Sequence, residues 1–311
     1  NDLPSPMEVV KLLQSNGVRR TMVYDSDVDV LRAFMGSGIT VIVHTTNALL
    51  PMLASDISVA TAWINTNIAP FAATISHISV GNEVLGTNNQ SQYSMFLNSA
   101  IHNVYNALVS VNLHESILVS TTHAAAVLDP SSFPPSLGHF SSDIVPNIMP
   151  ILNFLSSTGA PFMVNVYPFI AYIASSQNIE LPYALGSGNV QISDFNSGLI
   201  YTSLFDAQVD TFISAIEKLG FGNISLIVTE TGWPSYGHPS ATLANAQAYN
   251  AYILEHVASS RGTPKRPSTP IQTQIFALFN ENQKTGAEYE QHFGIFFPDQ
   301  TKVYDISLTP T

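Results

Sequence analysis

Short apolar, β-branched runs alternate with amphipathic segments from one end of this chain to the other. The apolar runs predict strands at Thr21–Tyr24, Thr40–Thr45, His77–Glu83, Ile117–Thr122, Phe162–Tyr167, Leu226–Glu230 and Gln274–Phe279. Helical spacing of apolar residues predicts helices near Pro6–Leu13, Val28–Phe34, Val59–Ile68, Gln92–Val111, Ile148–Ser156, Leu204–Leu219 and Leu243–Val257. Strands that are apolar throughout are buried on both faces, so the pattern predicts a parallel sheet covered by helices.

Two of the expected strands end on a glutamate, which narrows the choice between parallel folds. Glu230 closes one apolar run, and Asn82 and Glu83 close another. A buried carboxylate is costly unless it is used, and all strands of a barrel end at one common mouth. No glycine-rich phosphate loop follows an early strand, which weakens the open, dinucleotide-binding alternative. We therefore predict an α/β fold, a (β/α)8 barrel with one strand unaccounted for, as a single domain over residues 1–311. An irregular loop insertion around residues 168–200 is expected to border the mouth.

The composition excludes several classes of partner. A net charge of −12 disfavours nucleic acid and anionic membranes but does not repel a neutral polysaccharide. The absence of cysteine excludes disulfides and thiolate metal sites. His44 and His123 are not in metal-ligand spacing, so we read them at most as cleft lining and expect no metal and no cofactor. Sequons at Asn89 and Asn223 permit glycosylation in a secretory pathway.

Paired glutamates at strand ends suit the chemistry of glycosidic bonds. Retaining hydrolysis needs one carboxylic acid to protonate the leaving oxygen and one carboxylate to attack the anomeric carbon, about 5 Å apart. If the strand that is unaccounted for is the first, Glu83 ends the fourth strand and Glu230 the seventh. Those two ends face each other across one groove of a barrel, which is a suitable frame for such a pair.

Six longer motifs run along the chain in a fixed order. They are NDLPSP (Asn1–Pro6), VGNEV (Val80–Val84), VNVYP (Val164–Pro168), VTETGWPS (Val228–Ser235), FNENQK (Phe279–Lys284) and FGIFFPD (Phe293–Asp299). In these motifs the chain resembles plant glycoside hydrolase family 17, the endo-β-1,3-glucanases and their 1,3-1,4-glucanase relatives. The resemblance covers essentially the whole chain, and TETGWPS together with FNENQK is highly specific.

The resemblance implies a role for each matching residue. It makes Glu230 the nucleophile and Glu83 the general acid/base, and Asn82 the residue that holds the sugar 2-hydroxyl. A charged cluster around the pair is expected from Glu281, Lys284 and Glu290, which can place unequal charges beside the two carboxyls. Flat aromatic rings suit the apolar faces of pyranose sugars. The expected sugar platforms are Tyr24, Tyr167, Phe169, Trp233 and Phe297, with packing beneath the nucleophile loop an equal alternative for Trp233.

The activity implied by the resemblance is endo-hydrolysis of internal 1,3-β-D-glucosidic linkages in β-1,3-glucans, such as callose or fungal wall glucan, by a retaining double displacement. The alternatives are a 1,3-1,4-β-glucanase of the same family, or a glucan-binding wall protein with little turnover. We expect a monomeric glycoprotein of plant defence, secreted to the extracellular space or cell wall. A membrane anchor beyond the given sequence is compatible with this picture.

One departure from the family pattern concerns the start of the chain. The family begins with a short strand resembling GVNYG, shortly before the NDLPSP-type opening. Here Asn1 is the first residue, so this strand and the cleft tyrosine that it contributes are absent. We expect the functional protein to carry a few more residues upstream.

Overall fold

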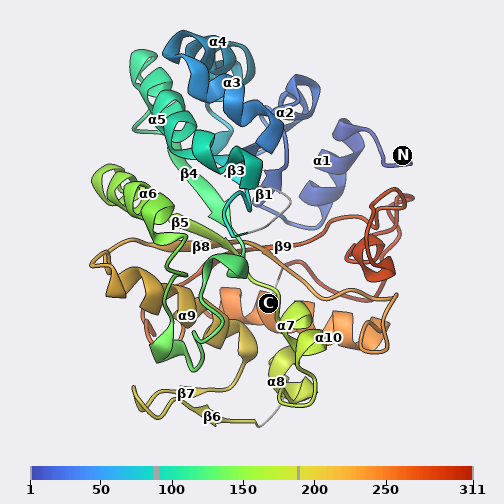
Figure 1. Ribbon diagram of the computed structural model, residues 1–311. Helices are drawn as coiled ribbons and strands as arrows, with labels where there is room; N and C mark the ends of the chain where they lie inside the picture. Colours follow the sequence, from blue (N-terminus) through green and yellow to red (C-terminus); the bar gives the residue numbers. More distant parts are fainter. Residues whose placement is uncertain (1, 87–90, 188–189, 310–311) are drawn as a thin grey trace.

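Seven parallel strands form a nearly closed barrel in the computed structural model, which describes residues 2–86, 91–187 and 190–309 (Figure 1). In the order of the sheet, the strands are β1 (Arg20–Val23), β2 (Thr40–Thr45), β3 (Ile75–Asn82), β4 (Leu118–His123), β5 (Phe162–Asn165), β8 (Leu226–Thr231) and β9 (Gln272–Ile275). Each neighbouring pair is parallel. The predicted barrel is confirmed, with each of the seven strands at or within a few residues of its expected range.

The barrel is held from the inside by a small apolar cluster. Ile42, Met163 and Ile227 come from β2, β5 and β8 and pack together with Met22 of β1. β1 and β9 lie at the two ends of the sheet, and Arg20 Nη1 donates a hydrogen bond of 3.5 Å across to Gln272 Oε1. The apolar side chains of β2, β5 and β8 therefore meet inside the barrel, and the Arg20–Gln272 bond joins its two edge strands, as closure requires.

Helices between the strands supply the outer layer. They are α1 (Pro6–Ser15), α2 (Val28–Phe34), α3 (Leu50–Ser55), α4 (Ile57–Asn67), α5 (Ser94–Ser110), α6 (Val145–Thr158), α7 (Pro168–Ala174), α8 (Leu181–Leu185), α9 (Leu204–Lys218) and α10 (Leu243–Ala258). Short 3-10 helices lie at Asn47–Leu49, Ala69–Phe71, Ser91–Tyr93, Ala125–Val127, Pro135–Leu137 and Glu288–Gln291. None of the helices in the described part of the chain is long and apolar enough to cross a membrane.

The start of α1 shows how local sequence sets a helix boundary. The amide nitrogen and hydroxyl of Ser5 both donate to Glu8 Oε2, at 2.8 and 2.6 Å, and Pro6 opens the first turn. Side-chain groups of this kind satisfy backbone donors that have no partner inside the helix. The helix start predicted at Ser5–Glu8 is confirmed.

Residues 168–200 are more regular than the sequence predicts. The segment contains α7, α8 and most of the antiparallel pair β6 (Ile192–Ser193) and β7 (Ile200–Tyr201), which lies at the opposite end of the molecule from α3 and α4 (Figure 1). The prediction of an irregular insertion is wrong because both helices are too short for a readable apolar period. Their signals are instead Pro168 and Pro182 in the first turns, where the missing N–H costs little.

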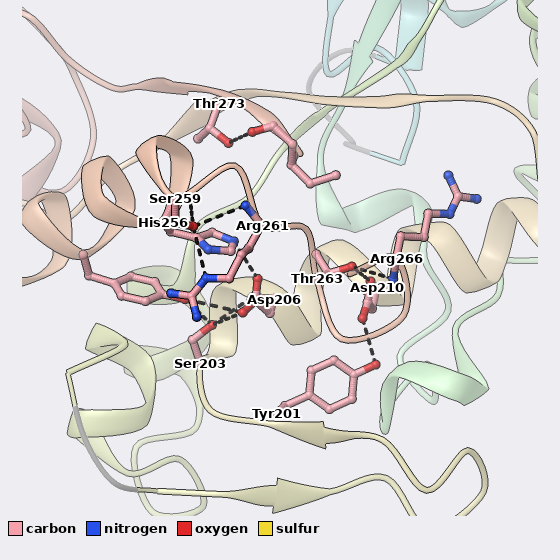
Figure 2. Close-up of polar contacts among 12 residues, drawn as sticks. Tyr201, Ser203, Asp206, Asp210, His256, Ser259, Arg261, Thr263, Arg266 and Thr273 are labelled. Atoms are coloured by element: carbon pink, nitrogen blue, oxygen red, sulfur yellow. Dashed lines mark hydrogen bonds and ion pairs between the residues drawn. The ribbon is translucent and has the colours of Figure 1, made fainter. Parts of the chain in front are cut away.

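Two buried aspartates on α9 have structural partners (Figure 2). Asp210 accepts hydrogen bonds from the Tyr201 hydroxyl at 3.0 Å and the Lys265 amide nitrogen at 2.9 Å, as well as from the Thr263 hydroxyl. Burial raises its pKa to about 6. Asp206 lies 3.1 Å from His256 Nε2 on α10. These carboxylates tie α9 to α10 and to the loop before β9, and they lie away from the strand ends that bear Glu83 and Glu230.

Candidate active site

Glu83 and Glu230 both line a cavity of about 950 Å³ at the carboxyl ends of the strands. Glu230 lies within β8 and is only 6% exposed, while Glu83 follows the last residue of β3 and is half-buried. The chain turns sharply here, since Gly81 and Glu83 have φ values of 75° and 53°. The Glu83 amide nitrogen donates to the Thr122 carbonyl at 2.9 Å, which fixes this turn against β4. A residue other than Gly in this conformation is under strain, which is common at functional sites.

Asn165 links the two glutamates and is not among the site residues expected from the sequence. It ends β5, where it is the lateral partner of Glu230 on β8, and its side chain is 3% exposed. Its Nδ2 donates to Glu83 Oε1 at 2.7 Å and to Asn82 Oδ1 at 3.3 Å. The available signal was a single amide inside the apolar run Phe162–Val166, because a buried polar side chain needs a partner.

The side chain of Asn47 holds the backbone of Asn82. Asn47 Nδ2 donates to the Asn82 carbonyl, and the Asn82 amide nitrogen donates to Asn47 Oδ1, both at 2.8 Å. This double contact fixes the end of β3 immediately before Glu83. Asn82 itself lines the cavity, where a sugar hydroxyl can reach it.

A charged cluster borders the same cavity. Lys284 Nζ lies 3.7 Å from a carboxylate oxygen of Glu281 and 3.7 Å from one of Glu290. It also lies 4.2 Å from the centre of the Phe276 ring, a favourable cation–π contact. All four residues line the cavity, so the structure brings the predicted cluster to the cavity that Glu83 and Glu230 line.

The electrostatics of the pair favour one proton shared by two carboxyls. Burial, followed by the nearby Glu83 carboxylate, raises the pKa of Glu230 to about 7. Hydrogen bonds from the Tyr167 and Tyr24 hydroxyls and the positive charge of Lys284 act in the opposite direction. The Tyr167 bond to Glu230 Oε2 is 2.7 Å long. Below about pH 7 the two carboxyls therefore hold one proton between them, and the displacement proposed below requires that proton to lie on Glu83 with Glu230 ionised.

This raised pKa makes a prediction about stability. The Glu230 carboxyl binds a proton more tightly in the folded protein, so its contribution to stability is fully present below about pH 4.5 and is lost as the pH rises through about 7. Glu230→Gln removes the cost of ionising this buried carboxyl at high pH. We therefore expect the free energy of unfolding of the variant, relative to that of the wild type, to be about 3 kcal/mol higher at pH 8 than at pH 4.5. Urea unfolding of both proteins at the two pH values measures the difference. A difference that does not change with pH would contradict the raised pKa.

The predicted aromatic platforms divide into two groups. Tyr24 and Tyr167 line the cavity. Phe169 and Trp233 are fully buried, and their rings pack edge to face at 5.1 Å. Trp233 Nε1 donates to the Ser240 carbonyl at 2.8 Å. Neither ring offers a face to a sugar, so the prediction of a platform is wrong for both and the packing alternative holds for Trp233. Phe297 is 42% exposed but does not belong to the lining of the described cavity.

The remaining candidates lie outside the cavity. His44 and His123 are buried, and burial lowers the pKa of each to about 3, so the expectation that they line the cleft is wrong. Asn223 is exposed in the turn between α9 and β8, whereas Asn89 lies outside the described residues. Within the described part of the chain, no three His, Cys, Asp or Glu side chains are grouped to hold a metal ion.

A parallel barrel whose strand ends bring two carboxyl groups into one cleft has the arrangement that glycoside hydrolysis uses. The chain belongs to the glycosyl hydrolases family 17, whose sequence model matches residues 1–308. The family expected from the motifs is thereby confirmed.

Individual relatives agree with this assignment. The chain is 42% identical to a glucan endo-1,3-beta-glucosidase of Vitis vinifera over 99% of its own length and 89% of the relative. It is 41% identical to glucan endo-1,3-beta-glucosidase 7 of Arabidopsis thaliana, again over 99% of the chain but over 62% of that relative. Among solved structures, it is similar to a β-1,3-glucanase and allergen of Cryptomeria japonica pollen, with a TM-score of 0.97, 46% identity and coverage of 100% of this chain and 97% of the other. A plant β-glucan endohydrolase matches with a TM-score of 0.91 and 36% identity, over 99% and 97% of the two chains.

Proposed function

We propose that the protein hydrolyses internal 1,3-β-D-glucosidic linkages of β-1,3-glucans, such as callose or fungal wall glucan, with retention at the anomeric carbon. The observation that carries this proposal is the pair Glu83 and Glu230 in one cleft, joined through Asn165, in a chain that belongs to family 17. The names of the relatives, glucan endo-1,3-beta-glucosidases, support the linkage.

The mechanism assigns one carboxyl to each side of the scissile bond. Glu230 attacks the anomeric carbon while Glu83 gives its proton to the glycosidic oxygen, which keeps the electron pair of the broken C–O bond. The sugar is then an ester of Glu230. In the second step Glu83 takes a proton from water, and the water oxygen displaces Glu230 from the anomeric carbon. The Tyr167 hydroxyl orients Glu230 Oε2 in both steps.

The shape of the cleft supports attack within a chain. A second cavity of about 840 Å³ adjoins the first, and the two share lining from the 125–126 turn, Asn165, Ala171 and Gln208. Its lining continues to Phe133, in the segment between β4 and α6, and to Phe212 of α9, neither of which lines the first cavity, so the groove extends past the pair Glu83 and Glu230 on one side. A polymer can lie along such a groove, whereas a closed pocket accepts only a chain end.

Within the same family, a 1,3-1,4-β-glucanase remains the second candidate. The plant β-glucan endohydrolase that matches this chain is one of two plant β-glucan endohydrolases described as having distinct substrate specificities. The two activities use the same pair of carboxyls, so only loop residues along the groove distinguish them. A glucan-binding wall protein with little turnover is the third candidate, and the intact catalytic pair argues against it.

Several further expectations belong to this proposal. We take residues 1–311 as a single catalytic domain that acts as a monomer without metal or cofactor. A secreted protein of the extracellular space or cell wall, active in plant defence, agrees with the polysaccharide substrate. The exposed position of Asn223 fits a glycosylated surface turn.

Product analysis tests the proposal. We expect short oligosaccharides of mixed length from linear β-1,3-glucan, and slower release from cereal mixed-linkage glucan at equal enzyme concentration. Faster release from the mixed-linkage polymer would favour the 1,3-1,4-glucanase. Binding of either glucan without any product would favour the binding protein.

A further inference from the structure

The side chain of Asn165 has a fixed orientation in the catalytic cleft. It follows three apolar residues of β5, Phe162–Val164, and both ends of its amide are used. Nδ2 faces two oxygen acceptors, Glu83 Oε1 and Asn82 Oδ1. Its Oδ1 accepts a hydrogen bond of 2.9 Å from the Thr229 hydroxyl, which is fully buried on β8. Turning the amide over would place its oxygen against two other oxygens.

Thr229 also ties this amide to the second glutamate. It precedes Glu230 in β8, and its hydroxyl lies 3.1 Å from the Val164 carbonyl on β5. The contacts Thr229–Asn165–Glu83 thus run from the strand that bears the nucleophile to the acid/base. A shift of either strand end would be transmitted to the other carboxyl through this amide.

We propose that Asn165, oriented by Thr229, is a positioning residue that promotes proton donation by Glu83 in the first chemical step. The proposal rests on the proposed glycosidase function and deepens it. An N–H donor stabilises an ionised carboxylate more than a neutral carboxylic acid. Its hydrogen bond therefore strengthens as Glu83 loses its proton to the glycosidic oxygen, so the stabilisation is greater in the transition state than in the substrate complex.

The two chemical steps depend on the Asn165 amide in different ways. In the second step Glu83 begins as a carboxylate and takes a proton from water, so the donor gives no help there. Loss of the Asn165 amide is expected to slow formation of the glycosyl-enzyme and not its hydrolysis. A buried asparagine with a purely structural role would have no such dependence on the leaving group.

The test compares two substrates with Asn165→Ala. On β-1,3-glucan, whose leaving oxygen needs a proton, we expect kcat to fall about 10- to 100-fold. On a dinitrophenyl β-glycoside of a short β-1,3-oligosaccharide, whose leaving group departs without a proton, we expect kcat to change less than about 3-fold. Equal losses on the two substrates would overturn the proposal.

A charge variant gives an independent readout. Asn165→Asp places a second negative charge beside Glu83 and makes loss of its proton harder. We expect the alkaline limb of the pH profile of kcat/KM to move up by about one pH unit. An alkaline limb at the wild-type position would overturn the proposal.

Two further variants keep the test falsifiable. Asn250→Ala is the matched control, because Asn250 is also a fully buried asparagine, whose Nδ2 donates to the Tyr304 hydroxyl, and neither residue lines the cleft. We expect no change in the ratio of the two kcat values. If Asn165→Ala does not fold, Thr229→Val replaces it, because this variant removes only the hydroxyl that orients Asn165. We expect its kcat to fall about 5-fold on the glucan and to stay unchanged on the dinitrophenyl glycoside. A wild-type rate for Thr229→Val on the glucan would then overturn the proposal.

The wild type distinguishes this inference from the proposed function. A wild type that hydrolyses neither substrate refutes the proposed function itself, and the inference falls with it. A wild type that hydrolyses both, with equal losses in Asn165→Ala, refutes only the role of Asn165.

Discussion

Glu230→Gln is expected to abolish turnover of β-1,3-glucan, with a loss in kcat of about 10⁴-fold or more, while oligosaccharides still bind. The amide is nearly the same size as the carboxylate and can still contact the Tyr167 hydroxyl, but it does not form the covalent bond to the anomeric carbon. Reducing-sugar release and calorimetric titration with an oligosaccharide measure the two properties separately.

Retained turnover combined with lost oligosaccharide binding in Glu230→Gln would contradict the role of Glu230 as nucleophile. A variant that turns over glucan but no longer binds oligosaccharide would place Glu230 in substrate recognition. Asp210→Asn is the matched control, since Asp210 is another buried carboxyl with a raised pKa but lies outside the cleft lining. We expect it to affect stability and leave the chemistry of the cleft unchanged.

Glu83→Gln is expected to lower kcat on the glucan about 10³-fold and to leave a substrate with an activated leaving group much less affected. Such a leaving group departs without protonation, so the first step no longer needs the acid. Comparing hydrolysis of the polymer with release of dinitrophenolate from an aryl glycoside gives the ratio. Added azide is expected to raise the rate of the Glu83→Gln variant on the aryl glycoside, because a small anion can attack the glycosyl-enzyme without a general base.

A Glu83→Gln enzyme that is equally slow on both substrates would argue against the acid role. It would also remove the basis for the inference about Asn165, which acts only through Glu83. The two single variants therefore form one series: Glu83→Gln and Asn165→Ala should depend on the leaving group in the same direction, with the larger effect from Glu83→Gln.

The barrel was predictable because its strands are short, apolar runs separated by helical spacing. β8 matches its predicted range to within one residue, and Glu83 was correctly expected at the tip of β3. Boundaries were less accurate where a strand runs directly into a helix. β5 ends at Asn165 although the apolar pattern continues to Tyr167: the Val166 amide nitrogen still donates to the Glu230 carbonyl at 2.8 Å, and Pro168 then starts α7.

The parts of the site that the sequence did not reveal depend on contacts between distant segments. Asn165 meets Glu83 across 82 positions of sequence, a contact that no local pattern encodes. The buried rings of Phe169 and Trp233 failed as predicted sugar platforms for a related reason. An aromatic residue near a strand end has the same sequence signature whether its ring faces the cleft or packs beneath it.

The catalytic cleft draws its side chains from β3, β5 and β8 and from the segment after β9, so the order of the sheet has a consequence for folding kinetics. Parallel neighbours are joined by crossover helices, and the contacts of Asn165 with Glu83 and of Tyr167 with Glu230 span 82 and 63 residues of chain. Such non-local contacts form late and slowly. An intermediate that has completed only the first strands contains Glu83 but lacks both Asn165 and Glu230. We therefore expect recovery of catalysis during refolding to coincide with assembly of the last strands, and forms that lack these strands to be inactive.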